Sequence, residues 1–204
     1  MPGQKMRFET WRARLKKHGG FLVGRVMDVI VPEFERHGFI WHSDYAANSV
    51  QQVSRSTLPL QMRQGIEWPT VEIQFDPRHG RNFSILFASL PLECREGGRK
   101  LIAREKAVVV NAPVWFLLCK GRNRSYEGQF GVGRFSLRPH ACMEREVQEA
   151  FSLLSVIFAH FEKRDEQHWL NQPFGYIDKN TLLVSSWRIY LEHIEKQRKT
   201  ARSD

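Results

Sequence analysis

Hydrophobic and polar residues alternate along three neighbouring stretches of the chain, at residues 58–63, 71–76 and 83–88. A period of two puts every second side chain on the same face of a strand, so this pattern predicts three strands with one buried face. The second and third stretches are separated by Pro77, Arg78, His79 and Gly80, a composition typical of a tight turn. We therefore expect an antiparallel meander, with weaker strands at 40–45, 49–56, 114–120 and 129–138.

Helical spacing is found on both sides of this meander. Phe8, Trp11 and Leu15 predict a short basic amphipathic helix over residues 5–18, stopped by the glycine pair at 19–20, and a second helix follows over 21–37. Between Met143 and Phe161 hydrophobic residues step by four and three along one side, which predicts a helix over 143–166 that packs on the sheet. The same spacing predicts a last helix over 180–198. The polar stretch 93–106 is expected to be a loop, leading into a short helix near 101–109.

These elements predict the α+β class: one domain over residues 1–204, with an antiparallel meander of five to seven strands packed against two long helices. Residues 1–5 and 197–204 are expected to be disordered tails. The chain is 42% hydrophobic and includes 14 Phe, 6 Trp and 4 Tyr, enough to build a substantial core. On the helix over 143–166, Leu154 and Phe158 should be fully buried.

Hydrophobic runs in this sequence are too short to cross a bilayer, which needs about 20 residues. The three cysteines, Cys94, Cys119 and Cys142, are odd in number and widely spaced, as expected for buried free thiols in a reducing compartment. We therefore expect a cytoplasmic protein with no membrane partner.

The distribution of charge points to candidate binding residues, because basic residues are concentrated in blocks. Residues 1–25 carry a net charge of +6, residues 95–138 carry +7 and residues 196–204 carry +3, whereas 26–94 and 139–195 carry −3 and −4. Blocks of one sign attract polyanions or an acidic protein face. The candidate binding residues lie on a hairpin tip (Lys120, Arg122, Arg124 and Tyr126), in a glycine-bearing loop (Arg95, Arg99 and Lys100) and on the first helix (Arg12, Arg14, Lys16 and Lys17).

Candidate catalytic residues have simpler explanations. Glu72 and Gln74, with Asp44 earlier in the chain, resemble the acidic site of metal-dependent nucleases, but the lysine usual in that site is missing. Glu72, Gln74 and Asp76 are also what the solvent face of an alternating strand requires. We therefore expect no catalytic activity and no cofactor.

Metal sites have equally little support. His42 with Asp44, and His140 with Cys142, are pairs of potential ligands, and His79, His160 and His168 are scattered singly. Zinc usually takes four ligands from paired spacings, so we expect no bound metal.

The helix that ends at Gly38 and Phe39, followed by the meander, is similar to several small bacterial domains, some of which are immunity proteins encoded beside toxins. The similarity covers residues 21–90 and implies no site residue. The sequence thus predicts a non-catalytic binding protein whose partner is nucleic acid or an acidic protein. An immunity-type protein that neutralises a toxin and a divergent metal-dependent nuclease are the alternatives.

Overall fold

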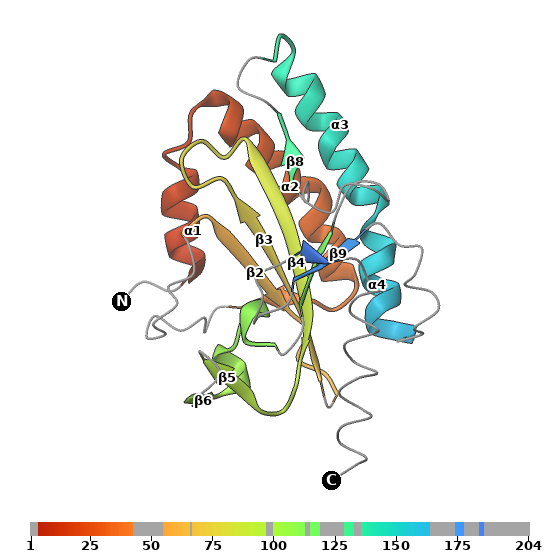
Figure 1. Ribbon diagram of the computed structural model, residues 1–204. Coiled ribbons are helices and arrows are strands. Elements are labelled where there is room, and N and C mark those ends of the chain that lie inside the picture. Colours follow the sequence, from red (N-terminus) through yellow and green to blue (C-terminus); the bar gives the residue numbers. More distant parts are fainter. Residues whose placement is uncertain are drawn as a thin grey trace.

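Helices cover one face of an antiparallel sheet, which confirms the α+β class (Figure 1). The computed structural model describes residues 4–42, 55–65, 67–96, 100–112, 115–118, 129–132, 136–163, 174–177 and 184–185. Within these ranges no helix is long and hydrophobic enough to cross a membrane.

The predicted meander forms the centre of the main sheet. It consists of β2 (Thr57–Gln61), β3 (Trp68–Phe75) and β4 (Asn82–Leu90), which pair in sequence order. The sheet continues on one side with β1 (Ile40–Trp41) and on the other with β7 (Trp115–Leu118), β9 (Phe174–Ile177) and β10 (Val184–Ser185), while the short β8 (Phe130–Gly131) also pairs with β4. The described residues therefore form an eight-stranded sheet rather than one of five to seven strands, and β1, β8 and β10 are only two residues long.

Several strand predictions differ from the structure at their ends. Of the predicted strand 129–138, the part that forms β8 is confirmed, and residues 133–135 lie outside the described residues. The predicted strand 49–56 also lies mostly outside them. Strand β10 falls within the helix predicted over 180–198, so that prediction is wrong at residues 184–185. The remainder of 180–198, like the predicted tail 197–204, lies outside the described residues.

The N-terminal helices differ from the prediction at both ends of the first helix and at the start of the second, whereas the second helix ends beside the predicted residue, His37. Helix α1 (Gln4–Arg12) is shorter than predicted, and it includes Gln4 and Lys5, which were expected to be disordered. Helix α2 (Lys17–Arg36) begins before the glycine pair that was expected to stop a helix. Leu15 lies in the break between them and packs beside Gly80, where an added Cβ would be 3.0 Å from its side chain. This contact takes Leu15 out of the helical pattern.

The predicted helix over 143–166 is two helices, α3 (Pro139–Ser152) and α4 (Leu154–Lys163), separated at Leu153. The hydrophobic residues of α3 and of α4 face the same core. The break therefore leaves the hydrophobic stripe intact, and the spacing of hydrophobic residues does not reveal it. Leu154 is 1% exposed and Phe158 is 8% exposed, which confirms that both are buried.

The sheet buries side chains on both faces. On the helix-covered face, Ile30 and Phe34 of α2 belong to the same hydrophobic core as Ile73 of β3 and Ile85 of β4, and all four are fully buried. On the opposite face a smaller hydrophobic cluster forms where residues 91–96 and 100–112 fold over the strands. This cluster contains Leu86, Ala88, Leu90, Cys94, Ala107, Val109 and Ala112.

Residues 91–96 and 100–112 are here called the covering segment, for which the sequence predicted a loop over 93–106 leading into a short helix near 101–109. They form a hairpin of β5 (Cys94–Glu96) and β6 (Lys100–Ile102), then two 3₁₀ turns, η1 (Arg104–Lys106) and η2 (Val109–Asn111). Cys94 is a buried free thiol, and burial raises its pKa, whereas the free Cys142 is half-buried. Cys119 lies outside the described residues.

Candidate functional site

The turn between β3 and β4 lies directly against the start of α2. Glycine at position 19 is required here, because a Cβ atom would collide with the carbonyl oxygen of His79. Trp11 of α1 donates a hydrogen bond from Nε1 to the carbonyl oxygen of Pro77, over 2.9 Å. The junction of α1 and α2 is therefore held against the turn, and the basic residues of both segments share one surface.

Two histidines bring the start of α3 to the same place. Nδ1 of His18, near the start of α2, lies 3.0 Å from Nε2 of His140, at the start of α3. The ring of His140 also stacks on Phe21, with 4.2 Å between centroids and 12° between planes. Partial burial lowers the pKa of His18, and repulsion from His140, Arg81 and Lys17 lowers it further. Protonation of His18 is thus disfavoured in these cationic surroundings.

A bidentate ion pair joins α2 and α3 at positions that follow the two histidines along each helix. Arg25 donates from Nε and Nη2 to the two carboxylate oxygens of Glu144, over 2.6 and 2.8 Å. These hydrogen bonds raise the pKa of Arg25 and lower that of Glu144. Because the histidine contact comes before the ion pair on both helices, α2 and α3 start at the same end of the molecule.

Basic side chains from all three segments therefore gather at one end, which we call the cationic end. It consists of Arg14, Lys16, Lys17, Arg78, Arg81 and Arg138, of which Arg81 is half-buried and the other five are exposed. None of those five forms an ion pair with a described residue, whereas Arg12 nearby pairs with Glu9 at 3.7 Å. A cluster of unneutralised cations of this kind creates a local positive field.

The predicted binding residues are only partly brought together. Arg12, Arg14, Lys16 and Lys17 lie at or beside the cationic end, as a group. Arg95 and Lys100 lie in the β5–β6 hairpin, at the opposite end of the molecule (Figure 1). Predicted residues outside the described ranges are Arg99, Lys120, Arg122, Arg124 and Tyr126.

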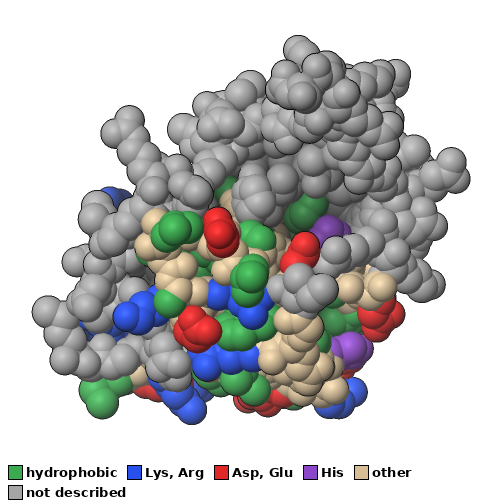
Figure 2. Space-filling model, turned by 90° about the horizontal axis from the view of Figure 1, so that it is seen from below, with side chains coloured by type: hydrophobic (Ala, Val, Ile, Leu, Met, Phe, Trp, Pro, Cys, Tyr) green, Lys and Arg blue, Asp and Glu red, His purple; other side chains and the backbone are tan. Residues whose placement is uncertain are grey.

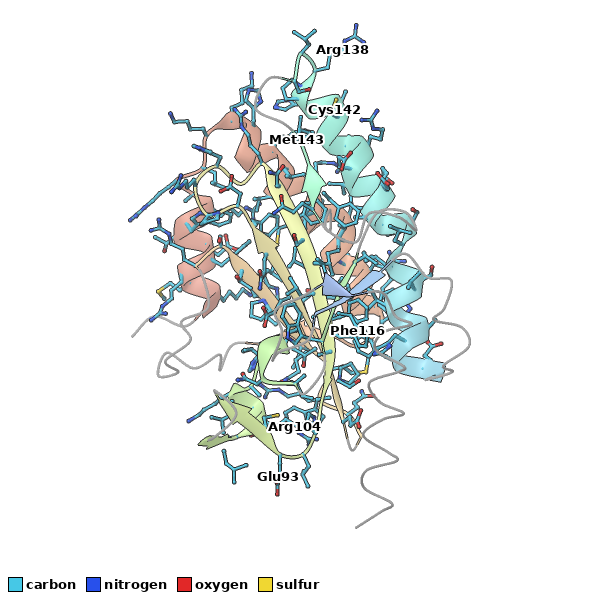
Figure 3. The ribbon with its side chains drawn as sticks, in the orientation of Figure 1. Glu93, Arg104, Phe116, Arg138, Cys142 and Met143 are labelled. Atoms are coloured by element: carbon cyan, nitrogen blue, oxygen red, sulfur yellow. The ribbon has the colours of Figure 1, made fainter. Side chains whose placement is uncertain are left out.

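Sequence reasoning missed three members of the cationic end, namely Arg78, Arg81 and Arg138. Arg78 and Arg81 belong to a segment with a net negative charge, so a count along the chain conceals them. The available signal was local, because the turn between two well-defined predicted strands carries basic residues of its own. Figure 3 shows Arg138 at the upper end of the molecule and Arg104, in η1 of the covering segment, far from it.

The interpretation of Glu72 as a solvent-facing residue is wrong. Glu72 is 2% exposed, because the covering segment lies over it. Its carboxylate accepts hydrogen bonds from the backbone N–H of Val109 and from the side-chain amide of Gln74, both over 2.9 Å. Asp44, the third residue of the nuclease alternative, lies outside the described residues. Glu72 thus anchors the covering segment in this structure.

The candidate metal ligands have other contacts. His42 is fully buried and donates from Nε2 to the carbonyl oxygen of Ala107, over 2.9 Å. His160 packs edge-on against Phe87 and Phe116, with centroids 5.4 and 4.8 Å away. Among the described residues no three His, Cys, Asp or Glu side chains are grouped so that they could hold a metal ion.

Comparison of the chain with models of known protein families, with curated proteins and with solved structures gives no match.

Proposed function

We propose that the protein binds nucleic acid through the cationic end, without performing chemistry on it. One observation carries this proposal: segments far apart in the sequence place five exposed cations on one surface, and none of the five pairs with a described acidic residue. A phosphate backbone offers regularly spaced negative charges, and each one neutralised by Lys or Arg releases condensed counterions. Arginine and lysine are both present, so the surface can form paired hydrogen bonds to phosphate as well as point-charge contacts.

The experiment compares two triple variants that lose the same charge. The test variant replaces Lys16, Lys17 and Arg78 by Ala, all exposed at the cationic end. The control replaces Lys5, Arg36 and Lys106 by Ala, which are exposed elsewhere on the surface. Binding to single-stranded and duplex oligonucleotides is measured across a salt series.

We expect the log–log slope of affinity against salt to flatten by about 0.7–0.9 for each phosphate that the protein no longer neutralises, thus by about two to three units in the test variant. The control variant should keep the slope of the wild type. Equal flattening in both variants would mean that only net charge matters. Failure of the wild type to bind any oligonucleotide at low salt would contradict the proposal and favour an acidic protein partner instead.

A further inference from the structure

A pocket of about 290 Å³ opens beside the cationic end, on the sheet face opposite α2. Gln74 of β3 pairs with Ser84 of β4, and their side chains line the pocket. Strand β8 pairs with β4 through Phe130 and Phe83, which brings Gln129 alongside Ser84. Three neighbouring strands or strand ends thus present amide and hydroxyl groups in one row.

These groups suit a neutral ligand that both donates and accepts hydrogen bonds. Side-chain amides and hydroxyls do both. Gln74 donates from Nε2 to Glu72 over 2.9 Å, and this contact fixes the orientation of its amide. Among the described residues that line the pocket, the ionisable one is Asp76, whose negative charge disfavours a phosphate group there. The volume is close to the lower end of the range typical of small-molecule sites, about 300 Å³.

The pocket and the cationic end are joined by the chain itself. Pro77 and Asn82 line the pocket, and the residues next to them, Arg78 and Arg81, belong to the cationic end. Consecutive Cα atoms are about 3.8 Å apart, so a ligand can occupy the pocket while a phosphate attached to it lies at these arginines. This arrangement separates a hydrogen-bonding site for an uncharged ring from a positive site for its phosphate.

We infer that the pocket receives one unpaired base of a single-stranded nucleic acid, an inference that rests on the nucleic-acid function proposed above. Nucleobases are uncharged and carry donors and acceptors along their edges. In a duplex these edges are paired and the bases are stacked, so a base reaches such a pocket only from a single strand or after being flipped out. Binding should therefore favour single strands over duplexes. DNA and RNA share this chemistry.

The test measures affinity by fluorescence anisotropy for four probes of equal length: single-stranded DNA, single-stranded RNA, duplex DNA and an abasic DNA strand. The wild type should bind a single strand about tenfold or more tightly than the duplex or the abasic strand, as expected for one bound base. Tighter binding of either RNA or DNA would identify the natural strand and would support the pocket equally.

Two variants block the pocket. Ser84→Leu fills it from the sheet, and Gln129→Leu fills it from an exposed position outside any strand. Both should reduce single-strand affinity about tenfold, to that of the abasic strand, and leave duplex binding unchanged. Gln64→Leu, at an exposed glutamine away from the pocket, is the matched control and should have no effect.

Equal wild-type affinity for single strand, abasic strand and duplex would overturn the inference while leaving the proposed function intact. So would an unchanged preference for single strands in Gln129→Leu, or the same reduction in Gln64→Leu. Absence of binding to all four probes would instead remove the proposed function, and the inference with it.

Discussion

Glu72 and Gln74 lie two residues apart on the same face of β3, yet their surroundings are opposite. Glu72 is 2% exposed beneath the covering segment, and Val109 donates a hydrogen bond to it. Gln74 is half-buried and lines an open pocket. This sheet face is therefore closed and largely hydrophobic at one end, and open and polar at the other. The difference comes from what folds over the strand, because the strand itself is regular across both residues.

The two ends also use basic residues differently. At the closed end the guanidinium of Arg104 lies 3.9 Å from the ring centroid of Trp68, and that of Arg63 lies 5.8 Å from it, so these cations take part in packing. Seen from below, that end mixes basic, acidic and hydrophobic side chains (Figure 2). At the open end, which is the cationic end, Lys16 and Lys17 are exposed. Surroundings, more than the number of basic residues, thus distinguish a binding surface from a packed one.

Both ends depend on the core that the helices form with the sheet. A cavity in this core should therefore lower the free energy of unfolding more than any other change considered. Leu154 is 1% exposed at the start of α4, so Leu154→Ala removes buried methyl groups and leaves a cavity. We expect the free energy of unfolding to fall by about 2–5 kcal/mol, measured by urea denaturation. A decrease below about 0.5 kcal/mol would show that α4 is peripheral, since surface substitutions typically stay within that range.

A substitution at the open end can separate its segments without changing any charge. Gly19→Ala would force the carbonyl of His79 away from α2, because the two cannot occupy the same space. We expect a decrease of about 1–3 kcal/mol in the free energy of unfolding, from overpacking. Nucleic-acid binding should weaken as well, because Arg78 would move away from Lys17. Gly24→Ala is the control, since a Cβ there meets nothing within 4 Å. Equal binding by both variants would mean that the cations act independently.

At the closed end, Glu72→Ala should loosen the covering segment. It leaves the buried N–H of Val109 without its acceptor, which typically costs about 1–3 kcal/mol of stability. Ser84→Ala on the open half of the same face should cost less than about 0.5 kcal/mol. Thermal unfolding of both variants, with amide exchange at Val109, measures the contrast. If the two variants were equally destabilised, the closed and open halves would not differ energetically.

The sequence was sufficient for the central strands β2, β3 and β4 and for the hydrophobic stripes of the helices, since these have regular periods of two and of three to four. It did not predict β5, β6, β9 or β10. It was insufficient for the covering segment. Residues 93–106 are polar and include two glycines, and the residues that pack on the sheet from this segment include the small Ala107 and Ala112. Alternation shows which residues share a face but does not show what covers that face, and so the burial of Glu72 could not be predicted.

Only some residues of the cationic end could be predicted from the sequence, for a related reason. Lys16 and Lys17 stand in a basic block and were identified, whereas Arg78 lies in a segment of net negative charge. Its proximity to them depends on the absence of a side chain at Gly19, a residue interpreted as a helix stop. A contact between segments about 60 residues apart leaves no trace in charge counted along the chain.

The smallest expected effect is on the pH dependence of stability, through His18 at the open end. Partial burial and the repulsion from His140, Arg81 and Lys17 lower the pKa of His18, so the folded protein takes up this proton less readily than the unfolded chain. Stability from this group is therefore present above the unfolded pKa of about 6.5 and is lost as pH falls below it. Protonation would also break the hydrogen bond between the two rings, if His140 supplies its proton.

The melting temperature of the wild type should accordingly fall more steeply between about pH 7.5 and 5.5 than that of His18→Asn, which cannot titrate. An NMR titration of the His18 ring should give a midpoint below about 6.5. Added oligonucleotide should move that midpoint upward, because bound phosphates offset the positive field of Lys17 and Arg81. A midpoint that oligonucleotide leaves unchanged, under conditions where binding is complete, would place the nucleic acid away from the histidine pair and would break the link between the open end and binding.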